Sequence, residues 1–400
     1  MGISGSERTL AIVGGVAAAV AAGYVINRAF EQHARTPQLT PGPTTNPVAP
    51  TTPPSTPVVT ATVPPTSTTV PPTSTIVAPT TTTAPPKPAP NPYANPVYQH
   101  DAPDPTVIRG GDGMYYSYST QAGYWPYNLI NTPIMKSADL THWEYVADAF
   151  PQRPAWVKGD MWAPHISRTG DHYTLFFSGR DAAGKMKVGY ATSSTPAGPF
   201  TDRGILISSG SWGHDIDPFL LQEPSGRTFL YWGSGPEGLF AQEIVVHPDG
   251  SITRPGDVVR VLNANAADPQ ERILVEGAWI QKKGDTYYLM YSAGSWRDNY
   301  VVNVARSSSP LGPFEKLGHP ILKSGNGFSN TGHHAMITDS AGQDWILYHA
   351  NVDAHPDWGR AMMLDRVDWV NGWPVVNGGA GPSITSPVGP VTDARAGAAA

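Results

Sequence analysis

A sequence repeat with five copies between Asp104 and Tyr348 constrains the fold of this chain more than any other feature of its sequence. Each copy opens on a lead residue and continues as a strand-like run that closes on an aromatic residue. The closing aromatics, 55 to 59 residues apart, are Tyr118, Phe177, Trp232, Tyr291 and Tyr348. Several short strands in each copy and a period of this length are typical of the blades of a β-propeller. Five copies therefore predict an all-β fold with five blades.

The lead residues lie 14 or 15 positions before the closing aromatics, and they are Asp104, Trp162, Asp217, Glu276 and His333. The innermost strand of each blade lines the central channel of a propeller. We therefore expect the five lead residues to occupy one equivalent point around the mouth of that channel. The strand and closing positions are alike in all five copies, whereas the lead residues differ in their chemistry. This indicates that the repeats build one scaffold and that the lead residues together form one site.

Three of the five lead residues, Asp104, Asp217 and Glu276, are carboxylates. Like charges held close together raise one pKa, which leaves a proton donor beside a partner that stays ionised. One carboxylic acid and one carboxylate are the minimum for hydrolysing a glycosidic bond. The repeat register thus favours a glycosidase-type site.

Composition narrows the class of ligand. A net charge of −6 offers no basic face, so nucleic acid is not an expected partner. Charged residues are few while Trp and Tyr are abundant, which suits a neutral, hydroxyl-rich ligand. The chain has no cysteine, which excludes disulfides, thiol nucleophiles and cysteine-based zinc sites.

The first 96 residues differ in character from the rest. Residues 10–26 form an apolar run between Arg8 and Arg28, so we expect residues 1–35 to be a signal peptide or membrane anchor, with cleavage left open. Residues 36–96 are rich in Pro, Thr and Ser and predict a disordered linker, either a tether to membrane or cell wall or a plain tail. The propeller is predicted to span residues 97–389 and a disordered tail residues 390–400. The predicted location is extracytoplasmic, secreted or anchored at the cell surface.

The order and context of the lead residues resemble glycoside hydrolase family 43, five-bladed propellers that cleave arabinosides and xylosides with inversion. The resemblance extends from about Pro103 to Ser383. The matching pieces are Pro103-Asp104-Pro105, Trp162-Ala163-Pro164, Ile216-Asp217-Pro218, Val275-Glu276-Gly277 and Gly332-His333, with Arg360 to Asp365 and Asp368 to Pro374 following. One departure is His165, where the family commonly has an acidic residue; Asp160 is a candidate to compensate.

The resemblance implies a role for each acid: Asp104 as general base, Glu276 as general acid, and Asp217 as the carboxylate that tunes and orients Glu276. It implies no required cofactor, but His333 matches an axial histidine that faces a metal ion, often calcium, or water in many members, so a water-mediated Ca²⁺ on the axis stays open. The predicted substrate-binding residues are Trp162, His333, Trp212, Trp296 and Arg360. The Trp residues could instead pack in the protein interior or on its surface rather than stack on a sugar. The alternative role for Arg360 is an ion pair between blades.

The predicted function is an exported, inverting hydrolase of arabinofuranosyl linkages, of the α-L-arabinofuranosidase or endo-1,5-arabinanase type, that acts on polysaccharide or oligosaccharide as a monomer. Three alternatives stay open: a β-xylosidase of the same family, a retaining invertase-like hydrolase, and a non-catalytic sugar-binding propeller. The sugar, the linkage and endo or exo action depend on loops whose conformation the sequence does not reveal.

Overall fold

The computed structural model describes residues 91–123, 129–209 and 214–393, all within the unit that spans residues 82–400. The predicted signal or anchor segment, most of the predicted linker and Trp212 lie outside the described residues. Across those three ranges, no helix combines the length and apolarity needed to cross a membrane.

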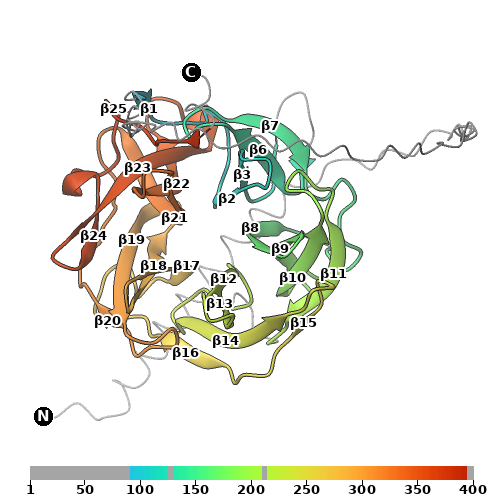
Figure 1. The fold of residues 1–400 in the computed structure, drawn as a ribbon. Coiled ribbons are helices and arrows are strands. Elements are labelled where there is room, and N and C mark those ends of the chain that lie inside the picture. The colour runs from blue at the N-terminus through green and yellow to red at the C-terminus, as the bar shows by residue number, and fades with distance from the viewer. Residues whose placement is uncertain (1–90, 124–128, 210–213, 394–400) are drawn as a thin grey trace, which may run out of the picture. The chain divides into compact units, whose positions relative to one another are not determined.

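Five antiparallel sheets of four or five strands follow one another along the chain and surround a common centre (Figure 1). From the inside outwards, blade 1 consists of β2 (Thr106–Arg109), β3 (Tyr115–Tyr118), β6 (Pro133–Ser137) and β7 (Glu144–Asp148). Blade 2 consists of β8 (Met161–Thr169), β9 (His172–Arg180), β10 (Met186–Ser193) and β11 (Thr201–Ile207). The small pair β4 (Ala122–Gly123) and β5 (Leu129–Ile130) stands apart from blade 1.

The remaining three blades repeat this order. Blade 3 consists of β12 (Phe219–Gln222), β13 (Thr228–Trp232), β14 (Leu239–Val246) and β15 (Ile252–Thr253), with β16 (Val259–Leu262) also paired to β14. Blade 4 consists of β17 (Val275–Lys283), β18 (Thr286–Ser295), β19 (Asp298–Ser307) and β20 (Glu315–Lys316). Blade 5 consists of β21 (Phe328–Thr338), β22 (Asp344–Val352), β23 (Arg360–Val370) and β24 (Trp373–Val376), with the short helices η1 (Pro356–Trp358) and η2 (Asn377–Gly379). The prediction of an all-β, five-bladed propeller is confirmed.

Burial changes from the inner to the outer strands of a blade. In blade 2 the second strand, β9, is buried along nearly its whole length, because a neighbouring blade covers each of its faces. The outermost strand, β11, alternates exposed with half-buried residues, as expected where side chains point to opposite faces. The continuous aromatic and β-branched runs of the sequence are therefore the second strands.

Apolar side chains form five clusters, one at each of the five interfaces between neighbouring blades. The closing aromatics of the repeat all lie in these clusters, on the second strands. The repeated part of the sequence thus makes the contacts by which one blade packs on the next.

Residues before blade 1 and after blade 5 hold the two ends of the propeller together. β1 (Tyr93–Ala94) pairs with β25 (Thr385–Ser386). The buried Asn95 amide donates to the carbonyl oxygens of Leu364 and Ser383 and accepts from the Leu364 N–H. β1 and Asn95 lie inside the stretch assigned to the linker, so the last residues of that stretch belong to the propeller domain. The Pro-rich context hid this two-residue strand, since its only sequence signal is one aromatic residue.

Asn95→Ala is expected to destabilise the propeller by about 2–3 kcal/mol, because it leaves buried backbone groups of two distant segments without partners. The melting temperature should fall by roughly 5 °C in differential scanning calorimetry. Asn91→Ala is the matched control, because its amide makes a single 3.5 Å hydrogen bond to Thr141. Equal melting temperatures for the two variants would contradict the role given to Asn95.

Candidate active site

A set of five residues, one within or just before each innermost strand, adopts the left-handed region with φ between 42° and 63°. These residues are Asp104, Ala163, Asp217, Gly277 and His333. Residues other than glycine rarely adopt this conformation, and it persists only where the surroundings hold it. The five positions are therefore structural equivalents around one end of the channel.

This equivalence corrects the register derived from the closing aromatics. Trp162 and Glu276 stand one residue before the left-handed position, where they pair with Ser178 and Ser292 on the second strands. A bulge follows each pair and inserts one residue into the inner strand. A bulge of this kind is invisible to a count along the sequence.

The five left-handed residues are anchored in the same way. Each donates its backbone N–H to a side chain of the preceding blade, at 2.7 to 3.1 Å. In the order of the blades, the acceptors are His349, Thr120, Ser178, Asp217 and Ser292. This closed ring of hydrogen bonds fixes the backbone from which the lead side chains project.

Asp104 is buried and held as a carboxylate. Its Oδ1 lies 3.0 Å from Arg360 Nη1, and its Oδ2 accepts a hydrogen bond of 2.5 Å from the Thr120 hydroxyl. Burial alone would raise the pKa of Asp104. The charge of Arg360, together with contacts to His333 and His349, outweighs burial and holds this pKa well below the ordinary value. Asp104 is thus ionised across the ordinary pH range.

Glu276 is buried with both carboxylate oxygens engaged. The Tyr300 hydroxyl donates to Oε1 at 2.7 Å, and the Ser234 hydroxyl donates to Oε2 at 2.8 Å. Burial raises the pKa of Glu276, and the charge of Asp104 adds to this. The two hydroxyls and Arg360 oppose the rise without cancelling it. Glu276 therefore tends toward the protonated form, unlike Asp104.

Asp217 is buried and interacts electrostatically with both of the other acids. Its Oδ2 accepts the N–H of Gly277, the residue after Glu276, at 3.1 Å. Burial, and then the charges of Glu276 and Asp104, raise the pKa of Asp217 well above its ordinary value. Because Asp217 and Glu276 repel each other when both are ionised, the pair favours a state that keeps one proton.

His333 and His349 contact the acids from blade 5. The Nδ1 of His333 lies 3.5 Å from Asp104 Oδ1 and 3.8 Å from Asp217 Oδ2, so one imidazole bridges two of the three carboxylates. Burial, reinforced by Arg360, lowers the pKa of His333 against the pull of Asp104. His349 Nδ1 accepts the Asp104 N–H, which places it in the structural ring.

The predicted aromatic residues are placed differently from one another. Trp296 is 37% exposed, and the Arg360 guanidinium stacks 4.8 Å from the centre of its ring. Trp162 is half-buried, and its ring carries Arg180 at 5.1 Å. Arg360, Asp104 and Trp296 thus form one contiguous group, whereas the Trp162 ring contacts Arg180 within blade 2.

Ring side chains from three innermost strands contact one another. Trp279 on β17 packs against three of the five interface clusters, and its ring lies 4.6 Å from that of Phe219. His165 lies against both rings, at 4.7 Å from Phe219 and 5.5 Å from Trp279, and burial lowers its pKa to about 3. His165, which stands where the family commonly has an acidic residue, therefore belongs to an aromatic cluster. Asp160, the candidate to compensate for it, forms an ion pair with Arg180.

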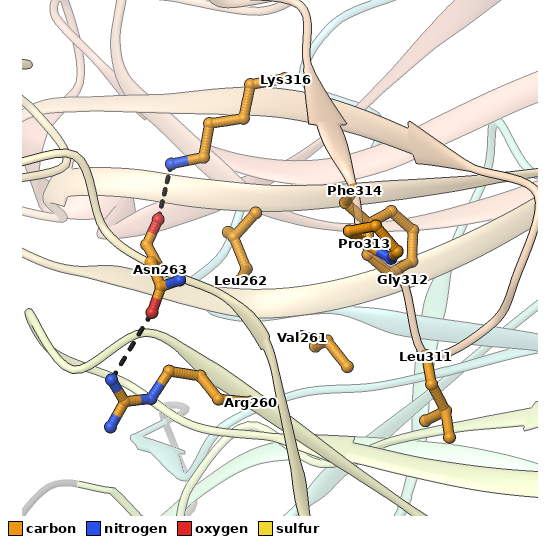
Figure 2. Close-up of a pocket in the computed structure, with 9 residues that line it drawn as sticks. All are labelled: Arg260, Val261, Leu262, Asn263, Leu311, Gly312, Pro313, Phe314 and Lys316. Carbon is orange, nitrogen blue, oxygen red and sulfur yellow. Dashed lines mark hydrogen bonds between the residues drawn. The ribbon is translucent and has the colours of Figure 1, made fainter.

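A cavity of about 440 Å³ lies elsewhere, between β16 of blade 3 and the segment that leads into β20 of blade 4. Figure 2 shows Arg260 and Lys316 reaching Asn263 from opposite sides, through its amide oxygen and its backbone carbonyl. None of the lead residues lines this cavity. It is therefore separate from the group of acids.

The side chains around His333 do not fit a calcium site built from protein ligands. Within the described ranges, no group of three or more His, Asp or Glu is arranged to hold a metal ion. Calcium takes six to eight oxygen ligands, whereas the nearby Asp104 oxygens are already engaged by Arg360 and Thr120. The mechanism proposed below uses no metal.

Gly332 makes room for the tyrosine that holds Glu276. A Cβ at Gly332 would lie 2.2 Å from Tyr300 Cδ1, and the Tyr300 ring also stacks on His349 with centroids 5.7 Å apart. The glycine of the Gly332-His333 motif is therefore a steric requirement of Tyr300.

Gly332→Ala is expected to displace Tyr300, break its hydrogen bond to Glu276, and destabilise the fold by about 1–3 kcal/mol through overpacking. Turnover should fall in the folded protein, as measured at a temperature well below its melting point. Gly325→Ala is the control, because the nearest atom to its added Cβ is 4.0 Å away. Unchanged turnover in Gly332→Ala would show that Tyr300 does not position Glu276.

Sequence reasoning missed Thr120, Ser234, Tyr300 and Trp279. A signal for the first two exists: each stands two residues after a closing aromatic, and Ser178, Ser292 and His349 stand one residue after theirs. Hydroxyl or imidazole groups at the end of every second strand are the partners of the lead residues. Tyr300 and Trp279 carry no comparable pattern.

Three comparisons place the chain among known proteins. The family profile described as Glycosyl hydrolases family 43 matches residues 93–374. A probable arabinan endo-1,5-α-L-arabinosidase A of Aspergillus flavus is 29% identical over 301 residues, covering 68% of this chain and 90% of that relative. An extracellular exo-α-(1→5)-L-arabinofuranosidase of Cellvibrio japonicus is 27% identical, covering 70% of this chain and 87% of that protein.

Solved structures agree with these relatives. A thermostable family-43 glycoside hydrolase superposes with a TM-score of 0.63 at 25% identity, covering 75% of this chain and 99% of the other. A Cellvibrio cellulosa α-L-arabinanase in complex with arabinohexaose gives a TM-score of 0.58 at 25% identity, covering 69% and 95%.

Proposed function

Because this chain belongs to glycosyl hydrolase family 43, and is therefore a glycoside hydrolase acting on O-glycosyl bonds, we propose that it cleaves α-L-arabinofuranosyl linkages with inversion, outside the cytoplasm. Support for the sugar comes from the relatives named as arabinan-degrading enzymes. Support for export comes from the apolar N-terminal run and from one relative named extracellular. Tethering and a monomeric state stay predictions.

The observation that carries the proposal is the opposite state of two carboxyl groups in one site. Arg360 holds Asp104 ionised, while burial and the charge of Asp104 favour the protonated form of Glu276. A permanent base and a proton donor are the two groups that single-step glycoside hydrolysis needs. A sugar-binding propeller would have no use for this difference.

In the proposed mechanism, Asp104 accepts a proton from a water molecule as that water attacks the anomeric carbon. Glu276 donates its proton to the glycosidic oxygen as the bond to the leaving group breaks. Inversion follows because attack and departure take place on opposite faces of the sugar. Afterwards Asp104 releases its proton to solvent, and Glu276 is protonated again.

The neighbouring side chains prepare these two groups. Asp217 helps to retain a proton on the pair that it forms with Glu276, and its oxygen fixes the backbone of Gly277. Tyr300 and Ser234 orient the Glu276 carboxyl. His333 and Arg360 are positioned to hydrogen-bond the hydroxyl groups of the sugar next to Asp104.

A substrate panel tests the sugar assignment. It includes aryl α-L-arabinofuranosides, aryl β-D-xylosides, linear 1,5-arabinan and arabinogalactan. We expect hydrolysis of the arabinosides. Activity on the xylosides alone would replace the proposal by the β-xylosidase alternative, to which a Bacillus subtilis relative named beta-xylosidase points. Hydrolysis of none of them would overturn the substrate class.

Proton NMR of the first product anomer tests the stereochemistry. We expect the β-anomer of arabinofuranose from an α-linked substrate, before mutarotation. An α-anomer as first product would favour the retaining, invertase-like alternative. Sugar binding without hydrolysis would favour the non-catalytic one.

A further inference from the structure

Arg360, the cation that holds Asp104 ionised, is itself held at its backbone. The Arg360 N–H donates to Asp101 Oδ1 at 2.9 Å, and the Arg360 carbonyl accepts the Ala102 N–H at 3.0 Å. Both partners belong to the segment that leads into blade 1, three and two residues before Asp104. The first residue of β23 is therefore fixed to the same stretch of chain that carries the general base.

This stretch lies along the start of β23. Tyr98 and Met362 exchange backbone hydrogen bonds of 3.2 and 3.3 Å, as in an antiparallel pair. The bond from Ala102 to Arg360 is also made by backbone groups. Asp101 adds a side-chain acceptor at the N–H of Arg360. Of these contacts, that of Asp101 is the one that depends on the type of residue.

Gly359 leaves the space that the Asp101 carboxylate occupies. It has φ 67° and ψ −135°, a conformation that residues with a Cβ avoid. A Cβ at this position would lie 2.5 Å from Asp101 Oδ1 and 2.7 Å from its Cγ. The Gly359 carbonyl is held in turn by Asn351 Nδ2, at 3.2 Å. The turn that precedes Arg360 is thus shaped around the side chain of Asp101.

The other end of Arg360 has little tolerance for movement. Its Nη1 lies 3.0 Å from Asp104 Oδ1, and its guanidinium lies 4.8 Å from the centre of the Trp296 ring. Hydrogen bonds of this type are confined to about 2.7–3.2 Å between donor and acceptor. A shift of about 1 Å at the backbone of Arg360 would therefore break its contact with the base.

The charge of Asp101 does not explain its place beside Asp104. A second carboxylate near Asp104 raises the pKa of Asp104, which opposes the ionised state that the base needs. Burial raises the pKa of Asp104 as well, and Arg360 is the largest of the influences that lower it. The benefit of Asp101 to the base therefore comes from its hold on Arg360.

We propose that Asp101 is a positioning residue for the general base: by holding the backbone of Arg360, its carboxylate keeps the guanidinium on Asp104. Asp101 has no reacting group in the proposed mechanism and acts through Arg360. The inference rests on the proposed function and extends it, because it adds to the site a residue outside the five lead positions.

Two variants of Asp101 separate its hydrogen bond from its charge. Asp101→Ala removes the acceptor, whereas Asp101→Asn keeps an oxygen that can accept the Arg360 N–H. The kcat/KM for 4-nitrophenyl α-L-arabinofuranoside is measured at pH 5 and at pH 7. In Asp101→Ala it should fall about 10-fold or more at pH 7, as expected for a displaced site residue. Asp101→Asn should retain most of the activity.

The ratio of kcat/KM at pH 5 to that at pH 7 reports the state of Asp104. In Asp101→Ala the ratio should fall below that of the wild type, because the pKa of Asp104 rises when the cation withdraws. In Asp101→Asn the ratio should stay equal or rise, because loss of a nearby negative charge lowers the same pKa. The two variants are thus expected to differ in sign.

A double-mutant cycle tests whether Asp101 acts through Arg360. Arg360→Met already removes the cation, so the addition of Asp101→Ala should cause little further loss of kcat/KM. Losses that multiply in the double variant would overturn the proposal.

Gly359→Ala disturbs the same contact without a change at Asp101. Its added Cβ would displace the carboxylate, so the pH ratio should fall as in Asp101→Ala. Gly378→Ala is the matched control, since Gly378 also has a positive φ, 61°, and no described atom lies within 4 Å of the added Cβ. Its ratio should equal that of the wild type.

Asp339→Ala controls for loss of stability. Asp339 is buried just after β21 and accepts the N–H groups of Gln343 and Val391. Its replacement should lower the melting temperature and leave the pH ratio unchanged. A lower melting temperature with an unchanged ratio in Asp101→Ala would show a merely structural role and overturn the proposal. A ratio that rises equally in Asp101→Ala and Asp101→Asn would show a role of charge alone and overturn it too.

The positioning role and the proposed function fail in different ways. If only xylosides are hydrolysed, the sugar assignment fails, and the same ratios are measured with 4-nitrophenyl β-D-xyloside. If neither series is hydrolysed, the proposed function is overturned, and the pKa of Asp104 is measured without substrate. The method is ¹³C NMR of the Asp carboxyl groups, with Asp104→Asn for assignment. A higher pKa in Asp101→Ala than in the wild type supports the positioning role, and equal values overturn it.

Discussion

Replacement of Glu276 by Gln is expected to lower kcat on linear 1,5-arabinan by about 10²–10⁴-fold, the usual contribution of a positioned general acid. Gln retains the size of Glu; its amide oxygen can accept from one of the Tyr300 and Ser234 hydroxyls, and its NH2 group can donate to the other. It has no proton to give to the leaving oxygen. The measurement is initial-rate kinetics under saturating substrate.

The leaving group makes this prediction specific. A 2,4-dinitrophenyl arabinofuranoside departs without protonation, so Glu276→Gln should lose far less activity on it than on arabinan. Asp104→Asn should lose activity on both substrates alike, because every attack needs an activated water. Equal losses on both substrates in Glu276→Gln would contradict the assignment of Glu276 as the acid.

Glu271→Gln is the matched control for a buried glutamate. Glu271 is buried five residues before Glu276 and accepts a hydrogen bond of 2.7 Å from the Tyr291 hydroxyl. Lys316 also contacts it. Its replacement should lower the melting temperature and leave turnover of the folded protein unchanged.

Replacement of Arg360 by Met is expected to move both limbs of the pH profile of kcat/KM to higher pH. The acid limb reports ionisation of Asp104, and Arg360 lowers the pKa of that carboxyl. The basic limb reports loss of the proton from Glu276, and Arg360 lowers that pKa as well. Without the cation the protonated form of each acid is favoured, so each pKa rises.

Activity should also fall in Arg360→Met, by about 10-fold or more at pH 5, because part of Asp104 becomes protonated and one sugar contact is lost. Arg366→Met is the control on the same strand, since Arg366 is exposed and pairs with Asp368. Its profile should match the wild type. A fixed acid limb in Arg360→Met would show that another group holds Asp104 ionised.

Much of the candidate site could be predicted from the sequence, because its three acids stand at the head of repeat copies. The number of blades follows from five closing aromatics, and Asp104, Asp217 and Glu276 follow from their places at the head of three copies. Arg360 was predicted to bind substrate, with an ion pair between blades as the alternative; in the structure it forms such an ion pair with Asp104, and its substrate contact stays a prediction. Trp162 was predicted from the register and from the motif Trp162-Ala163-Pro164, and in the structure its ring contacts the Arg180 guanidinium.

The register itself was wrong by one residue at Trp162 and Glu276. Bulges in the inner strands insert a residue without changing the hydrophobic pattern. Counting residues back from the closing aromatics therefore places Trp162 and Glu276 one residue away from the structurally equivalent position. The short pair of β1 and β25 escaped prediction for a related reason. Two residues are too few to show a strand period.

The sequence by itself determined the number of blades, the order of the acids along the chain and the family that they indicate. Each of these depends on repetition and local spacing, which a sequence displays directly. The tertiary structure alone decided which carboxyl is ionised and which tends to hold a proton. That difference arises from Arg360 beside Asp104, 256 residues away, and from the burial of Glu276 near the charge of Asp104. A contact across blades has no local sequence signal, and a pKa depends on such contacts together with burial.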